Sequence, residues 1–235
     1  MTSLLSSHGE QKLTPQPLLD MNYAFARTAL LVAAVRLHLF THLSKKALTP
    51  AELPLVKQED TALHVLDVGA GSAPWSAAFA HSYPSARITA LDLPAVVEQG
   101  RQQIANLGLS DRYTWIGADM ETVAFPPLTY DLIICGHVCR FISDERTKTL
   151  LARLCASLRS GGTIIIADVF LSEDRNGPPP AITLNLSMLV NTAKGRIRTV
   201  SEIATWLIES GLQDVQQFRA VGPFPVVVAR KGEER

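Results

Sequence analysis

The 235-residue chain is long enough for one large domain, or for one domain with a small appendage, and a chain of this size needs no disulfide bonds to stabilise its core. Hydrophobic residues make up 47% of the sequence and charged residues 19%, which is typical of a globular protein and excludes a disordered chain. The 22 Lys and Arg residues equal the 22 Asp and Glu residues, so the sequence lacks the basic excess that nucleic-acid-binding proteins usually show.

The first 60 residues are predicted to form a helical segment ahead of the main domain. The pattern is helical over residues 17–45, and apolar residues occupy nearly every face of 24–35, as in a helix buried against another subunit. The apolar stretch 29–35 is far shorter than the ~20 residues of a membrane-spanning helix, and the polar start has no basic signal-peptide region. Residues 48–53 have the capping pattern of a further helix start.

From residue 61 onwards predicted strands alternate with predicted helices. Strands that are apolar on both faces and alternate with helices indicate a parallel sheet covered on both sides. The predicted strands are 63–68, 87–92, 112–117, 130–136 and 162–168, and the predicted helices between them are 74–82, 94–107 and 144–159.

The pattern changes near the C-terminus. Residues 199–211 read as a helix with a capping box, and the strands 213–221 and 224–231 follow with only Gly-Pro between them. Two strands joined so tightly must be antiparallel. Residues 61–235 are therefore expected to form an α/β domain, a Rossmann-like doubly wound, mostly parallel seven-stranded sheet that ends in an antiparallel hairpin.

Acidic residues and glycines gather at the predicted ends of the first three strands. Gly69 and Gly71 follow the first strand, where folds of this kind bind their ligands, although a tight turn alone would also favour glycine. Asp92 ends the second strand, 21 residues after Gly71, where a carboxylate can accept ribose hydroxyls. Asp119 ends the third strand beside Met120, whose thioether suits a purine ring. Together these residues indicate an adenosine site.

The motifs narrow the choice of cofactor. Pro74 stands where a dinucleotide-binding turn has its third glycine, and the GxxxxGK[ST] phosphate loop is absent from the sequence. The chain resembles class I S-adenosylmethionine-dependent methyltransferases, and more closely the small-molecule O-methyltransferases that include caffeate, acetylserotonin and antibiotic-tailoring enzymes. The resemblance covers residues 63–229 and rests on "HVLDVGAGSAPWS", "ALDLPAVVE", "GADM", "YDLIICGHVCRFISDE", "LRSGGTIIIADVFLSEDR" and "LSMLVNT".

The resemblance implies S-adenosylmethionine as the cofactor and assigns its contacts. The turn after the first strand would hold the amino-acid end of the cofactor, the second strand end its ribose, and the third its adenine. The cofactor-binding residues that we expect are Asp67, Gly69, Ala70, Gly71, Asp92, Leu93, Asp119, Met120 and Cys135.

The resemblance also extends to the first 60 residues, which are similar to the family's dimerisation helices and imply a homodimer formed through them. Family members normally place a winged-helix lobe before the first strand, whereas only Pro54 to Ala62 lie there in this sequence. The way in which the substrate pocket closes, and the way in which a dimer forms, are therefore left open.

The position of the family's catalytic histidine is occupied by a different residue. Ungapped alignment of "FISDE" places Arg140 there, and arginine keeps its proton. Three readings remain. His137 could act as the base or be a structural residue. Arg140 could hold an anionic substrate group or pair with Asp144 or Glu145. Alternatively, an acidic phenol or enol could need no base, with Arg140 as a positioning group, which is the reading we favour.

The segment after the fifth strand is predicted to supply the substrate pocket, as a loop followed by a helix. The residues that we expect to line the pocket are Phe170, Asn185, Met188, Leu189 and Asn191. Plain core packing would also explain Met188 and Leu189. The two asparagines are more informative, because an amide in an apolar helix needs a partner.

The cysteines favour an intracellular protein without a metal site. Cys135, Cys139 and Cys155 are odd in number and contain no CxxC pair, so a disulfide framework is not indicated and we expect a cytoplasmic protein. The spacing of Cys135, His137 and Cys139 matches no zinc pattern. No membrane or nucleic-acid partner is expected.

The predicted function is methyl transfer from S-adenosylmethionine to a hydroxyl of a small aromatic or polyketide-like metabolite, in secondary metabolism. Transfer to carbon or nitrogen is an alternative. A second alternative is a cofactor-binding homologue that no longer methylates and serves another reaction or a partner protein. A nicotinamide dehydrogenase is disfavoured by Pro74. Neither the substrate nor the acceptor atom follows from the sequence.

Overall fold

A computed structural model describes residues 63–219 and 225–233. The predicted helical segment 1–60, including the helix start at 48–53, lies outside the described residues. Among the helices that the structure describes, none has the length and apolar character needed to cross a membrane.

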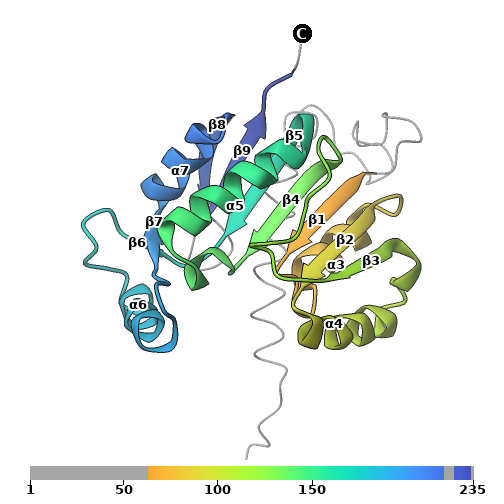
Figure 1. The fold of residues 1–235 in the computed structure, drawn as a ribbon, viewed down its shortest axis with the longest axis horizontal. Helices are drawn as coiled ribbons and strands as arrows, with labels where there is room; N and C mark the ends of the chain where they lie inside the picture. Colours follow the sequence, from red (N-terminus) through yellow and green to blue (C-terminus); the bar gives the residue numbers. More distant parts are fainter. Residues whose placement is uncertain (1–62, 220–224, 234–235) are drawn as a thin grey trace, which may run out of the picture.

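A seven-stranded sheet forms the centre of the described domain, with the strand order β3-β2-β1-β4-β5-β9-β8 (Figure 1). The first five strands pair in parallel, whereas β9 is antiparallel to both β5 and β8. This confirms the predicted doubly wound, mostly parallel sheet with an antiparallel pair at its C-terminal side. The strands are β1 (His64–Val68), β2 (Arg87–Asp92), β3 (Tyr113–Gly117), β4 (Tyr130–Gly136), β5 (Leu158–Ala167), β8 (Leu212–Arg219) and β9 (Pro225–Lys231).

Local signals in the sequence explain where the helices begin. A proline lies in the first turn of three of them, where no backbone N–H is needed. Ser143 accepts a hydrogen bond from the Arg146 N–H and caps a fourth, while Thr199 and Glu202 form the predicted capping box of the fifth. The helices are α3 (Pro74–Ser82), α4 (Pro94–Asn106), α5 (Asp144–Ser157), α6 (Pro179–Asn191) and α7 (Val200–Glu209), with short 3-10 turns η3 (Ser110–Arg112) and η4 (Cys139–Phe141).

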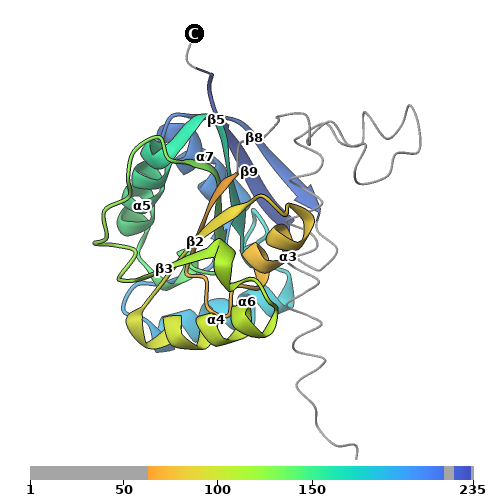
Figure 2. The same cartoon turned by 90° about the vertical axis from the view of Figure 1, so that its right-hand side faces the viewer.

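Alternate side chains of each strand enter two separate hydrophobic cores. On β4, for example, Ile133 and Cys135 belong to one core, and Leu132 and Ile134 belong to the other. Helices α5 and α7 supply the first core and α3 supplies much of the second, so the helices cover opposite faces of the sheet (Figure 2). The two-sided burial explains why the strands are apolar at consecutive positions.

The largest difference from the predicted boundaries lies between α5 and β5, whereas the other predicted strands and helices shift by no more than two residues at their ends. Helix α5 ends at Ser157 rather than at 159, and β5 begins at Leu158 rather than at 162. Leu158 has extended backbone angles, is fully buried and pairs with Tyr130, ahead of a register shift between β4 and β5. Tertiary burial of Leu158 therefore outweighs the local helical pattern.

A second, two-stranded sheet was not predicted. Strands β6 (Phe170–Leu171) and β7 (Arg198–Thr199) pair in parallel, in register from Phe170 to Arg198. Each strand is too short to give a periodic signal in the sequence. The pairing matters for the site because β6 directly follows the end of β5, and β7 carries a buried arginine.

Candidate active site

The carboxyl ends of the central strands lie at one level of the sheet. Val68 is in register with Leu91 of β2 and with Cys135 of β4, and Cys135 is in register with Ile166 of β5. The order of the strands reverses between β1 and β4, which is where doubly wound folds bind their ligands. The residues that follow these strands are therefore brought to one crevice.

The two glycines after β1 have different reasons to be glycine. Both have positive φ, 66° at Gly69 and 55° at Gly71, a conformation that favours glycine. A Cβ at Gly69 would lie 2.0 Å from Cγ1 of Val138, so this position is closed by the turn after β4. A Cβ at Gly71 would meet nothing within 4 Å. Gly71 thus leaves open space beside the backbone at the switch point, as close approach of a ligand requires.

Asp92 is tied to this turn by hydrogen bonds. Its Oδ2 accepts from the Gly71 N–H at 2.7 Å, and its Oδ1 accepts from the Leu93 N–H at 2.7 Å. The structure therefore joins two of the predicted cofactor-binding residues directly, across 21 positions of sequence. An ionised carboxylate has about four acceptor sites, so about two remain for further donors.

Asp67 is a buried carboxylate at the base of the crevice. Its side chain is 1% exposed, and its Oδ2 accepts a 2.6 Å hydrogen bond from the Ser76 hydroxyl, which in turn accepts from the Tyr113 hydroxyl at 3.1 Å. Its Oδ1 is buried without a partner among the described residues. Burial raises the pKa of Asp67 to about 6 because the charged form loses its hydration.

The remaining predicted cofactor residues surround the same edge of the sheet. Asp119 is exposed after β3, and its Oδ1 accepts from the Glu121 N–H at 2.8 Å. Met120 is half-buried against the first core, Leu93 is 53% exposed, and Cys135 is buried with its pKa raised by desolvation. Within the described parts of the chain, no group of three or more His, Cys, Asp or Glu residues is arranged to hold a metal ion.

A cluster of polar side chains lies where the chemistry was predicted. Nη1 of Arg140 donates to Oδ1 of Asp168 at 3.0 Å and lies 3.1 Å from Nδ1 of His137. Asp168 is 6% exposed and also accepts from the Val169 N–H at 2.8 Å. The suggested pairing of Arg140 with Asp144 or Glu145 is thus wrong, because Asp168 is its ion-pair partner.

Sequence reasoning did not identify Asp168 as a site residue. Asp168 directly follows β5, and Asp92 is the last residue of β2, so Asp168 is a further acid at the carboxyl edge of the sheet. The position of an acid at a predicted strand end could have found it, by the same argument that selected Asp92 and Asp119.

A buried arginine from β7 holds the turn that carries Arg140. Arg198 is 3% exposed and donates to the Cys139 carbonyl at 2.6 Å and to the Ile142 carbonyl at 2.8 Å. Its guanidinium also pairs with Asp144 at 3.0 Å. The carbonyls on either side of the Arg140 turn are therefore fixed by one side chain, which sequence reasoning missed because β7 has no pattern of its own.

Asp144 is shared with a second arginine, Arg196. Arg196 contacts Asp144 at 2.6 Å and Glu202 at 2.8 Å. These contacts lower the pKa of Asp144, and they lower that of Glu202 to about 2 despite the desolvation that opposes the shift. The ion pairs connect the start of α5 to the start of α7, next to the crevice.

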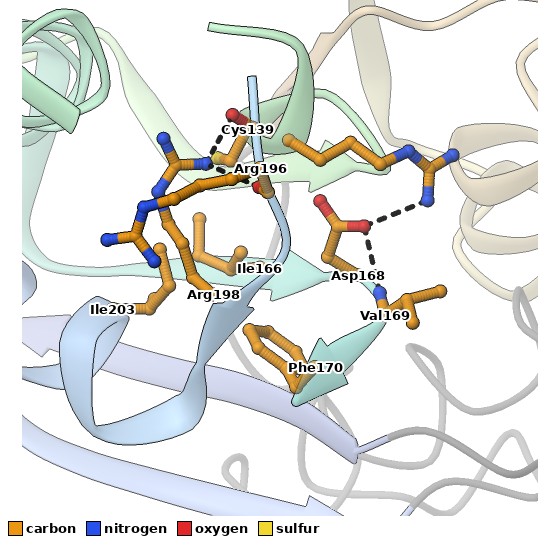
Figure 3. Close-up of a pocket in the computed structure, with 9 residues that line it drawn as sticks. Cys139, Ile166, Asp168, Val169, Phe170, Arg196, Arg198 and Ile203 are labelled. Atoms are coloured by element: carbon orange, nitrogen blue, oxygen red, sulfur yellow. Dashed lines mark hydrogen bonds and ion pairs between the residues drawn. The ribbon is translucent and has the colours of Figure 1, made fainter. Parts of the chain in front are cut away.

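A small cavity of about 10 Å³ lies between Asp168 and these arginines (Figure 3). This is near the smallest volume that can hold one water molecule, at roughly 10–15 Å³. The residues that line it are Cys139, Arg140, Ile166, Asp168, Val169, Phe170, Arg196, Arg198 and Ile203.

The predicted substrate-binding residues are distributed over several environments. Phe170 is buried in the lining of the small cavity. Asn185 accepts a hydrogen bond from the Ile197 N–H at 2.8 Å, which gives its amide the partner that we expected it to need. Met188 is 5% exposed in a third core, while Asn191 is exposed and donates to the Ser187 carbonyl, and Leu189 is 76% exposed. Their contact with a substrate remains a prediction.

Comparison with known proteins gives consistent results. A family model described as an O-methyltransferase domain matches residues 43–213. The tetracenomycin polyketide synthesis 8-O-methyl transferase of Streptomyces glaucescens is 26% identical over 71% of this chain and 48% of its own length. Acetylserotonin O-methyltransferase of Bos taurus is 31% identical over 71% of this chain and 47% of its own length. The chain therefore spans about half the length of the curated relatives that it matches.

A solved structure supports the same grouping. The apo crystal structure of the S-adenosylmethionine-dependent methyltransferase SibL superposes with a TM-score of 0.63 at 31% sequence identity. The superposition covers 76% of this chain and 54% of that one.

Proposed function

The chain belongs to the O-methyltransferase family, and from this premise we propose that it transfers the methyl group of S-adenosylmethionine to a hydroxyl of a small aromatic or polyketide-like metabolite. The observation that carries the proposal is the hydrogen bond between Gly71 and Asp92 beside open space at the switch point. The proposed acceptor class follows the relatives, which include a polyketide O-methyltransferase. A role in secondary metabolism follows from that acceptor class.

The residues present suit this cofactor. Asp92 retains about two acceptor sites for the ribose hydroxyls while it holds the turn. Oδ1 of Asp67 has no hydrogen-bond partner in the described part of the chain, so this carboxylate would be available to the positively charged amino group of the methionine end. Asp119 and Met120 would flank the adenine, and Ala70, Leu93 and Cys135 complete the proposed wall.

When bound, S-adenosylmethionine would supply an electrophilic methyl carbon, and transfer would form a carbon–oxygen bond to the acceptor while the carbon–sulfur bond to the sulfonium breaks. The protein must orient that oxygen and release its proton. A guanidinium can only donate, so a hydrogen bond across the 3.1 Å contact between Arg140 and Nδ1 of His137 requires Nδ1 to accept, in the tautomer that carries the ring hydrogen on Nε2. The contact of Nδ1 with Asp168 is longer, at 3.4 Å. This arrangement supports transfer without His137 as general base, from an acidic hydroxyl that loses its proton to water.

Titration with S-adenosylmethionine in a calorimeter tests the cofactor proposal. We expect Asp92→Ala to weaken binding at least tenfold, because losing charge-assisted hydrogen bonds to the ribose costs about 1.5–3 kcal/mol. Asp111→Ala, at an exposed acid in η3, is the matched control and should bind as the parent protein does. Failure of the intact, folded protein to bind S-adenosylmethionine would refute the proposal. Accumulation of S-adenosylhomocysteine only when an acceptor is added would establish transfer.

We further propose a cytoplasmic homodimer joined through helices within residues 1–60. The apolar faces of residues 24–35 support this, and so do Leu189 and Val190 of α6, which are 76% and 81% exposed. The three cysteines are free and buried, which suits a reducing compartment. Sedimentation velocity should give twice the mass of one chain. A single-chain mass at every concentration tested would contradict the dimer.

A further inference from the structure

Arg140 is anchored through one nitrogen. Nη1 donates to Oδ1 of Asp168 at 3.0 Å and lies 3.1 Å from Nδ1 of His137, while the guanidinium also lies over the Phe141 ring, 5.3 Å from its centroid. The carboxylate that receives it is itself fixed, because Asp168 is 6% exposed and also accepts from the Val169 N–H. The guanidinium therefore has a defined orientation before any ligand binds.

The opposite edge of the same guanidinium is formed by Nε and Nη2. Nε of Arg140 is buried and has no hydrogen-bond partner among the described residues, and no hydrogen bond from Nη2 to a described residue is formed either. Buried donors are nearly always paired in folded proteins, so an unpaired one needs an explanation such as a missing ligand. The Arg140 side chain is 17% exposed, so part of it is accessible to a ligand.

Arg140 lies in the part of the fold where methyl transfer is proposed to occur. Arg140 follows β4 and Asp168 follows β5, at the carboxyl edge of the sheet and on the same side of the switch point. Arg198 holds the carbonyls of Cys139 and Ile142 on either side of Arg140. The turn that carries Arg140 is thus held by Arg198 at the carboxyl edge of the sheet, where the acceptor would approach the cofactor.

We propose that the Nε–Nη2 edge of Arg140 binds a carboxylate on the acceptor substrate, which is therefore a hydroxyaryl carboxylic acid. Two N–H groups in one plane match the two oxygens of a carboxylate, and the charge strengthens both hydrogen bonds. The bound carboxylate would orient the neighbouring hydroxyl without a protein base. This inference rests on the proposed methyltransferase function and specifies its substrate class.

The test uses the 235-residue chain saturated with S-adenosylhomocysteine, so that no turnover occurs. Calorimetric titration with 1-hydroxy-2-naphthoate, its methyl ester and 1-naphthol should show the acid binding at least tenfold more tightly than the other two. Arg140→Met should abolish the difference, and Arg140→Lys should restore only part of it, because an ammonium keeps the charge but has no planar fork. Arg146→Met is the control, since that side chain is 67% exposed and pairs with Glu121 at the surface.

A second measurement does not depend on the variants remaining folded. In the intact protein the Nε–H resonance of Arg140 should shift when the acid is added and not when the ester is added. Equal affinity for the three probes, no binding of any probe, or an unchanged resonance would overturn the inference. Loss of S-adenosylhomocysteine binding in the intact protein would instead refute the proposed function, so the two failures are distinguishable.

Discussion

Replacing Arg198 by methionine is expected to lower the free energy of unfolding by about 2–5 kcal/mol, because two buried carbonyls lose their hydrogen-bond donor. Arg198 is 3% exposed and bonds two carbonyls, those of Cys139 and Ile142, as well as Asp144. Methionine fills much of the same volume but donates no hydrogen bond, so both carbonyls would remain buried without a partner. Each such orphaned group costs about 1–3 kcal/mol.

Urea denaturation followed by circular dichroism measures this loss. Arg146→Met provides the matched control, because the exposed Arg146–Glu121 pair should contribute only about 0–1 kcal/mol. Arg198→Lys should lie between the two, since lysine keeps the charge but cannot bond two carbonyls and a carboxylate in one plane. A loss below about 1 kcal/mol in Arg198→Met would show that the turn is held by other contacts.

The second large effect is a pH-dependent gain in stability from Asp67→Asn. Burial raises the pKa of Asp67 from its ordinary value of 3.8 to about 6 in the folded protein, so the folded state holds the proton more tightly than the unfolded chain does. The stability that this proton contributes is fully present below pH 3.8 and is lost as the pH rises towards and through 6. At about 1.36 kcal/mol per pH unit, the parent protein loses on the order of 3 kcal/mol from this group.

Unfolding free energies measured from pH 4 to pH 7 test the predicted direction of this change in stability. The difference between Asp67→Asn and the parent should increase over that range by about 2–3 kcal/mol, because asparagine has no charge to bury. Asp111→Asn, at an exposed site, should show no comparable increase. A pH-independent difference between Asp67→Asn and the parent would mean that Asp67 is hydrated in solution.

The sheet was predictable because its signals are local and repeated. Apolar strands such as β1 and β4, each followed by a proline-started or serine-capped helix, predicted a parallel sheet covered on both faces. The β6–β7 pair and the early start of β5 were not predictable, because they depend on burial of single residues such as Leu158 by distant parts of the chain. The segment before residue 63 remains a prediction.

In the candidate site, too, some residues were predictable from the sequence and others were not. Gly71 and Asp92 were found by spacing, and the structure joins them by a hydrogen bond, although their contact with a cofactor is still a prediction. The hydrogen bonds that Arg140 donates to Asp168 and Arg198 donates to Cys139 were not foreseen, because they join residues 28 and 59 positions apart. No spacing rule encodes such pairs, since only the folded sheet brings the segments together.

The three buried cysteines can be used to measure local opening of the folded protein. All three thiols are buried, and desolvation raises the pKa of each, that of Cys139 to about 12. Only a thiolate reacts with an alkylating reagent at an appreciable rate, so the closed molecule is nearly inert. The rate at which each cysteine is alkylated therefore measures how often its own region opens, in β4 for Cys135, in the Arg140 turn for Cys139 and in α5 for Cys155. Mass spectrometry of a thiol-labelling time course could thus separate motion of the central sheet from motion of the turn at the crevice without introducing any label site.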